Sequence, residues 1–77
     1  MPHIIVKLYP GRTEEQKISL AEQITRDVVT IAKCPAEAVS VAIEEVEPER
    51  WNEEVYKPYI LNNDSNLYKK SVKTLST

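Results

Sequence analysis

Two short segments of the chain alternate apolar and polar side chains, and a period of two is typical of β-strands. The first strand is expected over residues 4–9 and the second over residues 38–46. In the first strand the alternation places three aliphatic side chains on one face, Ile4, Val6 and Leu8. The other face then carries a mixed set, His3, Ile5, Lys7 and Tyr9. The aliphatic face is the one that we expect a helix to cover.

Between the two strands the spacing of apolar residues becomes helical. Pro10-Gly11 indicates a turn, and Thr13 followed by Gln16 fits a capping box, so the helix should begin just after Thr13. It should end near Lys33-Cys34, because Pro35 disfavours helical geometry in the residue before it. The predicted apolar stripe of this helix consists of Ile18, Leu20, Ala21, Ile24, Val28 and Ile31.

A strand, a helix and a second strand form a βαβ unit, whose right-handed crossover makes the two strands parallel. We therefore predict an α+β fold in a single domain over residues 1–77. Its βαβ core should occupy residues 2–46, and a C-terminal helical extension should occupy residues 47–77.

The pattern changes after Pro48, where the extension begins. A short helix is expected over residues 52–60, although Pro58 is an obstacle within it. A polar connector should follow at residues 62–66, and then a basic tail at residues 67–75 that could be helical.

Composition limits what can hold so small a chain together. A domain of 77 residues buries only about 60% of the surface of its unfolded chain and usually needs a disulfide, a metal or a partner. Cys34 and His3 are the only residues of their kinds, which excludes an internal disulfide and gives no metal-ligand cluster. Two strands also leave open edges and one uncovered face, which carries Ile5, Tyr9 and Ala42. By elimination, we expect an obligate oligomer.

The net charge and the hydropathy of the chain limit the classes of partner that it could bind. The net charge is −2 and no basic run is interleaved with aromatic residues, which argues against nucleic acid as a partner. No leader-like segment and no stretch long enough to span a bilayer is visible, so we expect no membrane partner and a cytoplasmic location. Cys34 is expected to fill the end of the helix, with a reactive thiol as the less favoured alternative.

The strongest candidate for a catalytic residue is Pro2. If Met1 is removed, Pro2 becomes the amino terminus and carries a secondary amine that the following strand holds in place. An amine beside apolar side chains loses hydration in its charged form, which lowers its pKa and makes it a usable general base at neutral pH. The alternative is that Pro2 only marks the start of an edge strand. With Met1 retained, its nitrogen is a tertiary amide and cannot act as a base.

Three features stand at fixed distances from Pro2: the segment Gly11-Arg12-x-x-x-Gln16-Lys17, the strand residues Val39-Ser40-Val41, and Trp51. In this order they resemble the 4-oxalocrotonate tautomerase family. The resemblance implies a tautomerase-superfamily βαβ fold and an isomerase with Pro2 as catalytic base. Such an enzyme moves a proton between the 2-hydroxyl side of an enol and the adjacent carbon, which yields a 2-keto acid. It implies no metal or cofactor.

The resemblance also suggests substrate-binding roles. Arg12 matches a position that holds a substrate carboxylate, for which a guanidinium is well shaped, although it could be only a surface residue at a turn. Trp51 matches an aromatic pocket wall, with a core residue anchoring the short helix at residues 52–60 as the alternative. Ser40 stands where dicarboxylate-processing members have a second arginine. This departure favours a monocarboxylate enol of arylpyruvate type, with Ser40 or an ordered water as a weaker hydrogen-bond donor.

The longer, glycine-free C-terminal part is similar to that of the small bacterial phenylpyruvate-type tautomerases. Such a tail would obstruct a trimer of dimers, so a homodimer is favoured, with a hexamer as the alternative. Two other functions stay open at this point. The same scaffold could hydrate or dehalogenate an unsaturated acid, although no acidic residue lies in the first strand near Pro2 to activate water. The chain could also be a small dimeric binding module in which Pro2 is incidental.

Overall fold

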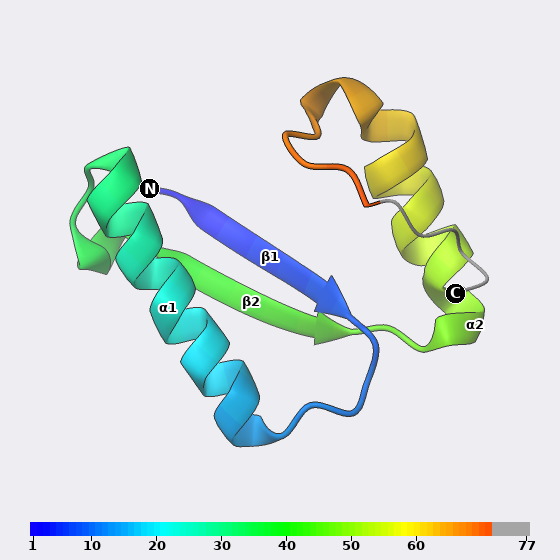
Figure 1. Cartoon of the computed structure of the whole chain (residues 1–77), viewed down its shortest axis with the longest axis horizontal. Coiled ribbons are helices and arrows are strands. Elements are labelled where there is room, and N and C mark those ends of the chain that lie inside the picture. Colours follow the sequence, from blue (N-terminus) through cyan, green and yellow to red (C-terminus); the bar gives the residue numbers. More distant parts are fainter. Residues whose placement is uncertain (72–77) are drawn as a thin grey trace. The chain divides into compact units, whose positions relative to one another are not determined.

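The computed structural model describes residues 1–71 of the chain. The chain divides into two compact units, the first from Met1 to Glu45 and the second from Val46 onward. The first unit contains, in order, strand β1 (His3–Leu8), helix α1 (Glu14–Ala32), the short 3-10 turn η1 (Ala36–Ala38) and strand β2 (Ser40–Glu45) (Figure 1). That both units form a single domain stays a prediction.

Strands β1 and β2 pair in parallel, as the βαβ prediction requires. Their register places His3 beside Ser40 at one end and Leu8 beside Glu45 at the other. Each strand differs from its expected range by one or two residues at its ends, which is the usual uncertainty of element boundaries. The predicted fold class is confirmed.

Helix α1 begins and ends where its capping residues place it. The Thr13 hydroxyl accepts a hydrogen bond from the Gln16 backbone N–H at 3.1 Å, and the Thr13 N–H donates to Gln16 Oε1 at 2.8 Å. At the other end Lys33 has φ 61° and ψ 57°, a left-handed conformation that stops the helix before Pro35. Cys34 is half-buried at this helix end, with its sulfur 3.9 Å from the carbonyl oxygen of Val28.

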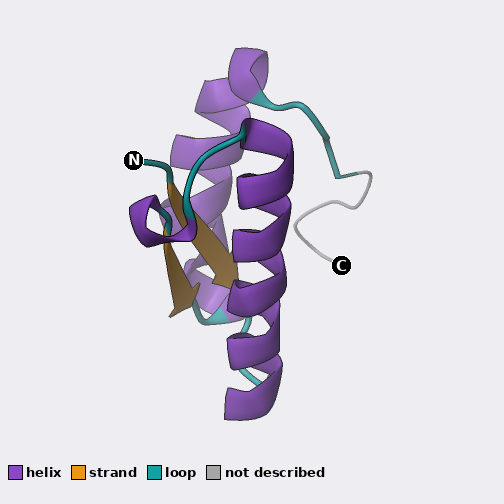
Figure 2. Ribbon diagram, turned by 90° about the vertical axis from the view of Figure 1, so that its left-hand side faces the viewer, coloured by secondary structure: helices purple, strands orange, loops and turns teal. Residues whose placement is uncertain are grey.

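Helix α1 lies beside one face of the two strands (Figure 2). Its half-buried positions recur along one side of the helix: Lys17, Ala21, Ile24, Thr25, Val28 and Val29. The expected stripe was therefore wrong at its edges, because Ile18 is 51% exposed, Ile31 is 78% exposed and Leu20 is also exposed. These three side chains fit the helical spacing, but they are not covered within the single chain.

The first unit contains no buried side chain. Among the described residues only Val46 and Val55 are buried, and both belong to the second unit. On the face of the sheet opposite α1, Ile5 is 50% exposed beside its register partner Ala42. A βαβ unit with so little burial gains little hydrophobic stabilisation on its own.

The second unit begins with the single-turn helix α2 (Pro48–Trp51), which continues as the π-helix η2 (Asn52–Ile60) and the 3-10 helix η3 (Leu61–Asn66). The expected helix over residues 52–60 is present, but the helical segment starts earlier, at Pro48. The wider π-helical turn accommodates Pro58, whose ring would clash with the carbonyl four residues earlier in an α-helix.

Beyond η2 the extension departs from expectation in two places. The connector expected at residues 62–66 forms part of the helix η3 instead of an irregular turn. Residues 67–71 of the expected tail are not helical, and residues 72–75 lie outside the described part of the chain. Among the described residues, no helix has both the length and the apolar character that crossing a membrane requires.

Candidate active site

Pro2 lies immediately before β1 and is half-buried. Its carbonyl oxygen accepts a hydrogen bond from the backbone N–H of Ser40 at 3.2 Å, so residue 2 is tied to the neighbouring strand. Met1, by contrast, is 92% exposed. Removal of Met1 would therefore leave a terminal proline whose backbone stays anchored to β2.

Ser40, the first residue of β2, lies next to Pro2, whose carbonyl it binds through its backbone N–H. Its hydroxyl oxygen is 2.6 Å from Nδ1 of His3, its register partner on β1. The residues His3 and Ser40 share the sheet face opposite α1 with the pair Lys7–Glu44 at the far end of the strands. His3 was not selected as a site residue from the sequence, although the strand alternation had already placed it on this face.

Arg12 lies in the loop between β1 and α1, and its side chain is exposed. Within the described residues its guanidinium forms no ion pair and no hydrogen bond. It borders a shallow hollow of about 540 Å³, which is lined by Leu8, Arg12, Glu15, Gln16, Ser19 and Leu20. A guanidinium in a hollow that two leucines also line is suited to a carboxylate that carries an apolar substituent.

The two candidate residues Pro2 and Arg12 lie at opposite ends of β1. Leu8, the last residue of β1, follows Pro2 by six residues, and at about 3.3 Å per residue the strand separates them by roughly 20 Å. Figure 1 shows β1 running from the N-terminus to the loop that leads into α1. Within one chain, Pro2 is not among the residues that line the hollow beside Arg12.

Trp51 is the last residue of α2 and is half-buried. It belongs to the second unit, whereas Pro2, Arg12 and Ser40 belong to the first. Both roles expected of Trp51, a pocket wall or an anchor of the helix, stay predictions.

Two lysines pair with the carboxylates of β2 at the end of the sheet that lies nearest the Arg12 loop. Lys17 of α1 donates to Glu45 of β2 at 3.2 Å and lies 3.7 Å from Glu14. The hydrogen bond with Glu45 is the main cause that raises the pKa of Lys17, and the charges of Glu45 and Glu14 act in the same direction. On the opposite face Lys7 pairs with Glu44. The carboxylates of β2 are thus engaged at the end of the sheet away from Pro2.

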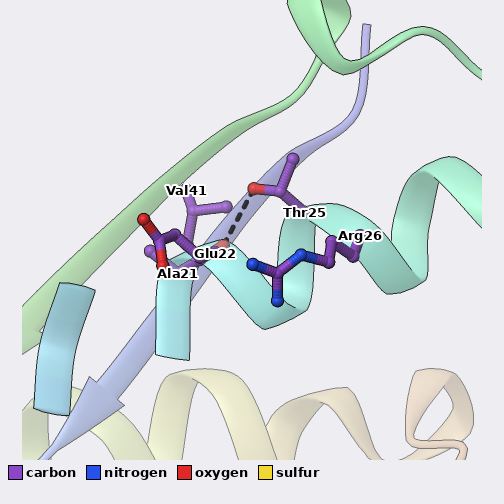
Figure 3. Close-up of a pocket in the computed structure, with 5 residues that line it drawn as sticks. All are labelled: Ala21, Glu22, Thr25, Arg26 and Val41. Atoms are coloured by element: carbon purple, nitrogen blue, oxygen red, sulfur yellow. Dashed lines mark hydrogen bonds between the residues drawn. The ribbon is translucent and has the colours of Figure 1, made fainter. Parts of the chain in front are cut away.

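A second hollow, of about 420 Å³, lies between α1 and β2 (Figure 3). It is lined by Ala21, Glu22, Thr25, Arg26 and Val41. The Thr25 hydroxyl donates to the carbonyl oxygen of Ala21 at 2.8 Å, so its proton is already used within the helix. Glu22 and Arg26 carry the only charges of this hollow. Pro2 is not among the residues that line this hollow, so we do not treat it as the candidate site.

The described residues contain no group of three or more histidine, cysteine, aspartate or glutamate side chains that could hold a metal ion. In the first unit, a proline precedes β1, a serine begins β2 beside it, and an arginine lies in the loop that follows β1.

Comparison with known proteins identifies the family. The model of the family described as "Tautomerase enzyme" matches residues 2–54. A probable tautomerase of Xylella fastidiosa is 37% identical over 70 residues, which cover 91% of this chain and 85% of the relative. Tautomerase PptA of Pectobacterium atrosepticum is 39% identical over 71 residues, which cover 91% of this chain and 93% of the relative.

Solved structures agree with this match. The crystal structure of TomN, a 4-oxalocrotonate tautomerase homologue of the tomaymycin biosynthetic pathway, has a TM-score of 0.63 at 33% identity, covering 83% of this chain and 95% of TomN. YwhB, another homologue of 4-oxalocrotonate tautomerase, has a TM-score of 0.63 at 29% identity, covering 97% of this chain and 95% of YwhB. The chain belongs to the 4-oxalocrotonate tautomerase family and is an isomerase of the tautomerase type.

Proposed function

We propose that this chain converts the enol form of a 2-keto acid with one carboxylate, of arylpyruvate type, into its keto form. The amine of Pro2, exposed by removal of Met1, accepts the proton of the 2-hydroxyl and delivers a proton to the adjacent carbon. The substrate thereby changes only the position of a proton and of a double bond. The observation that carries this proposal is the hydrogen bond from the Ser40 N–H to the Pro2 carbonyl, which anchors a half-buried proline at the start of β1.

Anchoring matters because a general base must be held within reach of the proton that it abstracts. A terminal residue that frays into solvent keeps full hydration of its charged form. A half-buried amine loses part of that hydration, which lowers its pKa toward neutrality. The backbone bond to Ser40 supplies the anchoring without using the nitrogen of Pro2.

The hollow beside Arg12 supports the choice of substrate. The Arg12 guanidinium would bind the single carboxylate through two parallel hydrogen bonds, and Leu8 and Leu20 would contact the apolar substituent. Glu15 lines the same hollow and would repel a second carboxylate. Ser40, in place of a second arginine, offers one donor in place of a bidentate cation. These features together favour a monocarboxylate.

Because Pro2 and Arg12 of one chain lie roughly 20 Å apart along the six residues of β1, the proposal requires Arg12 from another copy of the chain. The uncovered sheet face and the lack of buried side chains in the first unit support such self-association. We propose a homodimer, with a hexamer as the alternative, in the cytoplasm.

No observation favours the other two functions. The carboxylates of the sheet, Glu44 and Glu45, lie at the end opposite Pro2, where neither could activate water beside it for hydration or dehalogenation. A binding module would not need a free Pro2 amine.

The proposal is tested on the purified protein by measuring its intact mass and its ketonisation of the enol form of phenylpyruvate, followed by ultraviolet absorbance. A sample that lacks Met1 should be active, and a sample engineered to retain residues before Pro2 should be inactive. Equal activity of the two samples would disprove the role of the amine.

A further inference from the structure

A residue to which neither the resemblance nor the comparisons give a role lies at the centre of the Pro2 end of the sheet. His3 is bonded covalently to Pro2, and its Nδ1 lies 2.6 Å from the hydroxyl oxygen of Ser40. Ser40 in turn holds the Pro2 carbonyl through its backbone N–H at 3.2 Å. Pro2, His3 and Ser40 therefore form one connected unit, and the geometry at one of them constrains the other two.

The hydroxyl of Ser40 has only one proton, so the direction of its bond to His3 decides what it can do for a substrate. If Ser40 donates to Nδ1 of His3, its oxygen can only accept hydrogen bonds. If Nδ1–H of His3 donates to Ser40, the hydroxyl proton is free for another acceptor. The oxygen on C2 of the substrate gains negative charge as the enol proton leaves. Only the second arrangement stabilises that charge.

We propose that His3 is a positioning residue that donates from Nδ1 to the Ser40 hydroxyl and thereby directs the serine proton toward the C2 oxygen of the substrate. This inference rests on the proposed function. A hydroxyl that accepts a hydrogen bond becomes a stronger donor, so the pair does part of the work of the arginine that other family members have at position 40. It provides one donor instead of a bidentate fork, which suits a single oxygen.

The other polar pair on the same face does not compete for Ser40. Lys7 and Glu44 are paired four residues further along the two strands, at a distance of about 13 Å. A control outside the first unit is Glu54→Gln, which removes the ion pair of Glu54 with Arg50 in the second unit.

The test compares kcat and KM for the enol form of phenylpyruvate in four variants: His3→Ala, His3→Asn, Ser40→Ala and the double variant His3→Ala/Ser40→Ala. His3→Ala should lower kcat about three- to tenfold with little change in KM, as expected for an interaction that strengthens in the transition state. His3→Asn should restore most of the loss, because the asparagine amide can donate from near the place of Nδ1. Glu54→Gln should behave like the parent.

The double variant distinguishes positioning from a general structural effect. If His3 acts only through Ser40, the double variant should match Ser40→Ala, and His3→Ala should cost nothing further in that background. An additional loss of the same size in the Ser40→Ala background would overturn the inference, as would parent-like kcat in His3→Ala. Should His3→Ala fail to fold, a kcat of Ser40→Ala equal to that of the parent would overturn it equally.

Failure of the proposed function can be distinguished from failure of the inference about His3. It would appear as absent ketonisation in the parent, or as full activity of a Pro2→Ala variant, before any His3 variant is measured.

Discussion

The backbone N–H of Ser40 lies 3.2 Å from the carbonyl oxygen of Pro2, at the point where β2 begins beside β1. This bond extends the parallel pairing by one residue beyond His3 and includes the terminal residue of the proposed mature chain. It uses the carbonyl of Pro2 and leaves the nitrogen out of the sheet. An amine that is anchored in this way can face a substrate while its own residue is held by the fold.

Replacement of Pro2 by alanine should therefore separate catalysis from folding. The variant keeps the carbonyl that Ser40 binds, but it carries a primary amine of different basicity and flexibility. We expect kcat/KM for the enol form of phenylpyruvate to fall about a hundredfold, the lower end of what a general base contributes. The measurement is ultraviolet absorbance of the enol. Circular dichroism and melting temperature should stay close to those of the parent, and unchanged turnover would exclude Pro2 as the base.

Arg12 should act mainly in substrate binding. Arg12→Ala should raise KM about tenfold to a hundredfold, because a charge-assisted hydrogen bond contributes roughly 1.5–3 kcal/mol and is shared by the ground and transition states. Arg12→Lys keeps the charge but loses the planar fork, so its KM should lie between those of the parent and the alanine variant.

A neutral ester provides the control for this role. The ester of the same enol lacks the carboxylate that Arg12 would bind, so parent and Arg12→Ala should process it equally. If the alanine variant lost the same factor on the acid and on the ester, Arg12 would not be recognising a carboxylate.

Much of the first unit could be predicted from local sequence signals. The capping box of Thr13 and Gln16 placed the start of α1, and Pro35 placed its end, because both act within a few residues of the boundary. The exposure of Ile18 and Ile31 could not be foreseen in the same way. An apolar residue on the flank of a helix fits a roughly helical spacing, and only the position of the sheet decides which line of side chains is covered.

The site required information that the sequence holds only indirectly. The contact of His3 with Ser40 depends on the register of two strands that are 37 residues apart. The alternation of side chains along the first strand assigned His3 to one face of the sheet. It could not identify Ser40 as the hydrogen-bond partner of His3. The π-helical form of η2 was also missed, because a proline within a helical pattern predicts an obstacle and does not say how the backbone accommodates it.

Stability at high pH should depend on the pair Lys17–Glu45. The bond to Glu45 raises the pKa of Lys17 above its ordinary value of 10.5, which means that the folded state favours the charged lysine. A group whose pKa is raised in the folded state stabilises fully below its unfolded pKa, and this contribution is lost as the pH rises through the folded pKa. We therefore expect this contribution to the melting temperature to be lost as the pH rises from about 10.5 through the higher folded pKa of Lys17.

Other groups also titrate in this pH range. The test is therefore a comparison of the pH dependence of the melting temperature between variants. Glu45→Gln should melt lower than the parent at neutral pH and should show a smaller decline between about pH 8 and pH 11. Glu22→Gln changes the net charge equally, and Glu22 has no ion pair within the described residues, so its pH profile should match that of the parent. Parallel profiles for the parent and Glu45→Gln would show that the pair contributes nothing to folding.

The uncovered face of the sheet should be the place where two copies of the chain meet. Ile5 is 50% exposed in the single chain beside Ala42, and no side chain of the first unit is buried. Light scattering of the full-length protein at micromolar concentration should give the mass of a dimer. Ile5→Glu places a charge on this face and should shift the protein to a monomer with a lower melting temperature, because burying an unpaired carboxylate is costly.

The matched control is Leu61→Glu, which places the same charge on an exposed leucine of the second unit. This variant should keep the mass and the activity of the parent. Because the proposed site takes Pro2 from one copy and Arg12 from another, loss of the dimer in Ile5→Glu should also abolish ketonisation, although Ile5 itself contacts no substrate. An active monomer would refute the shared site, and a hexamer mass for the parent would refute the dimer while leaving the need for a second copy intact.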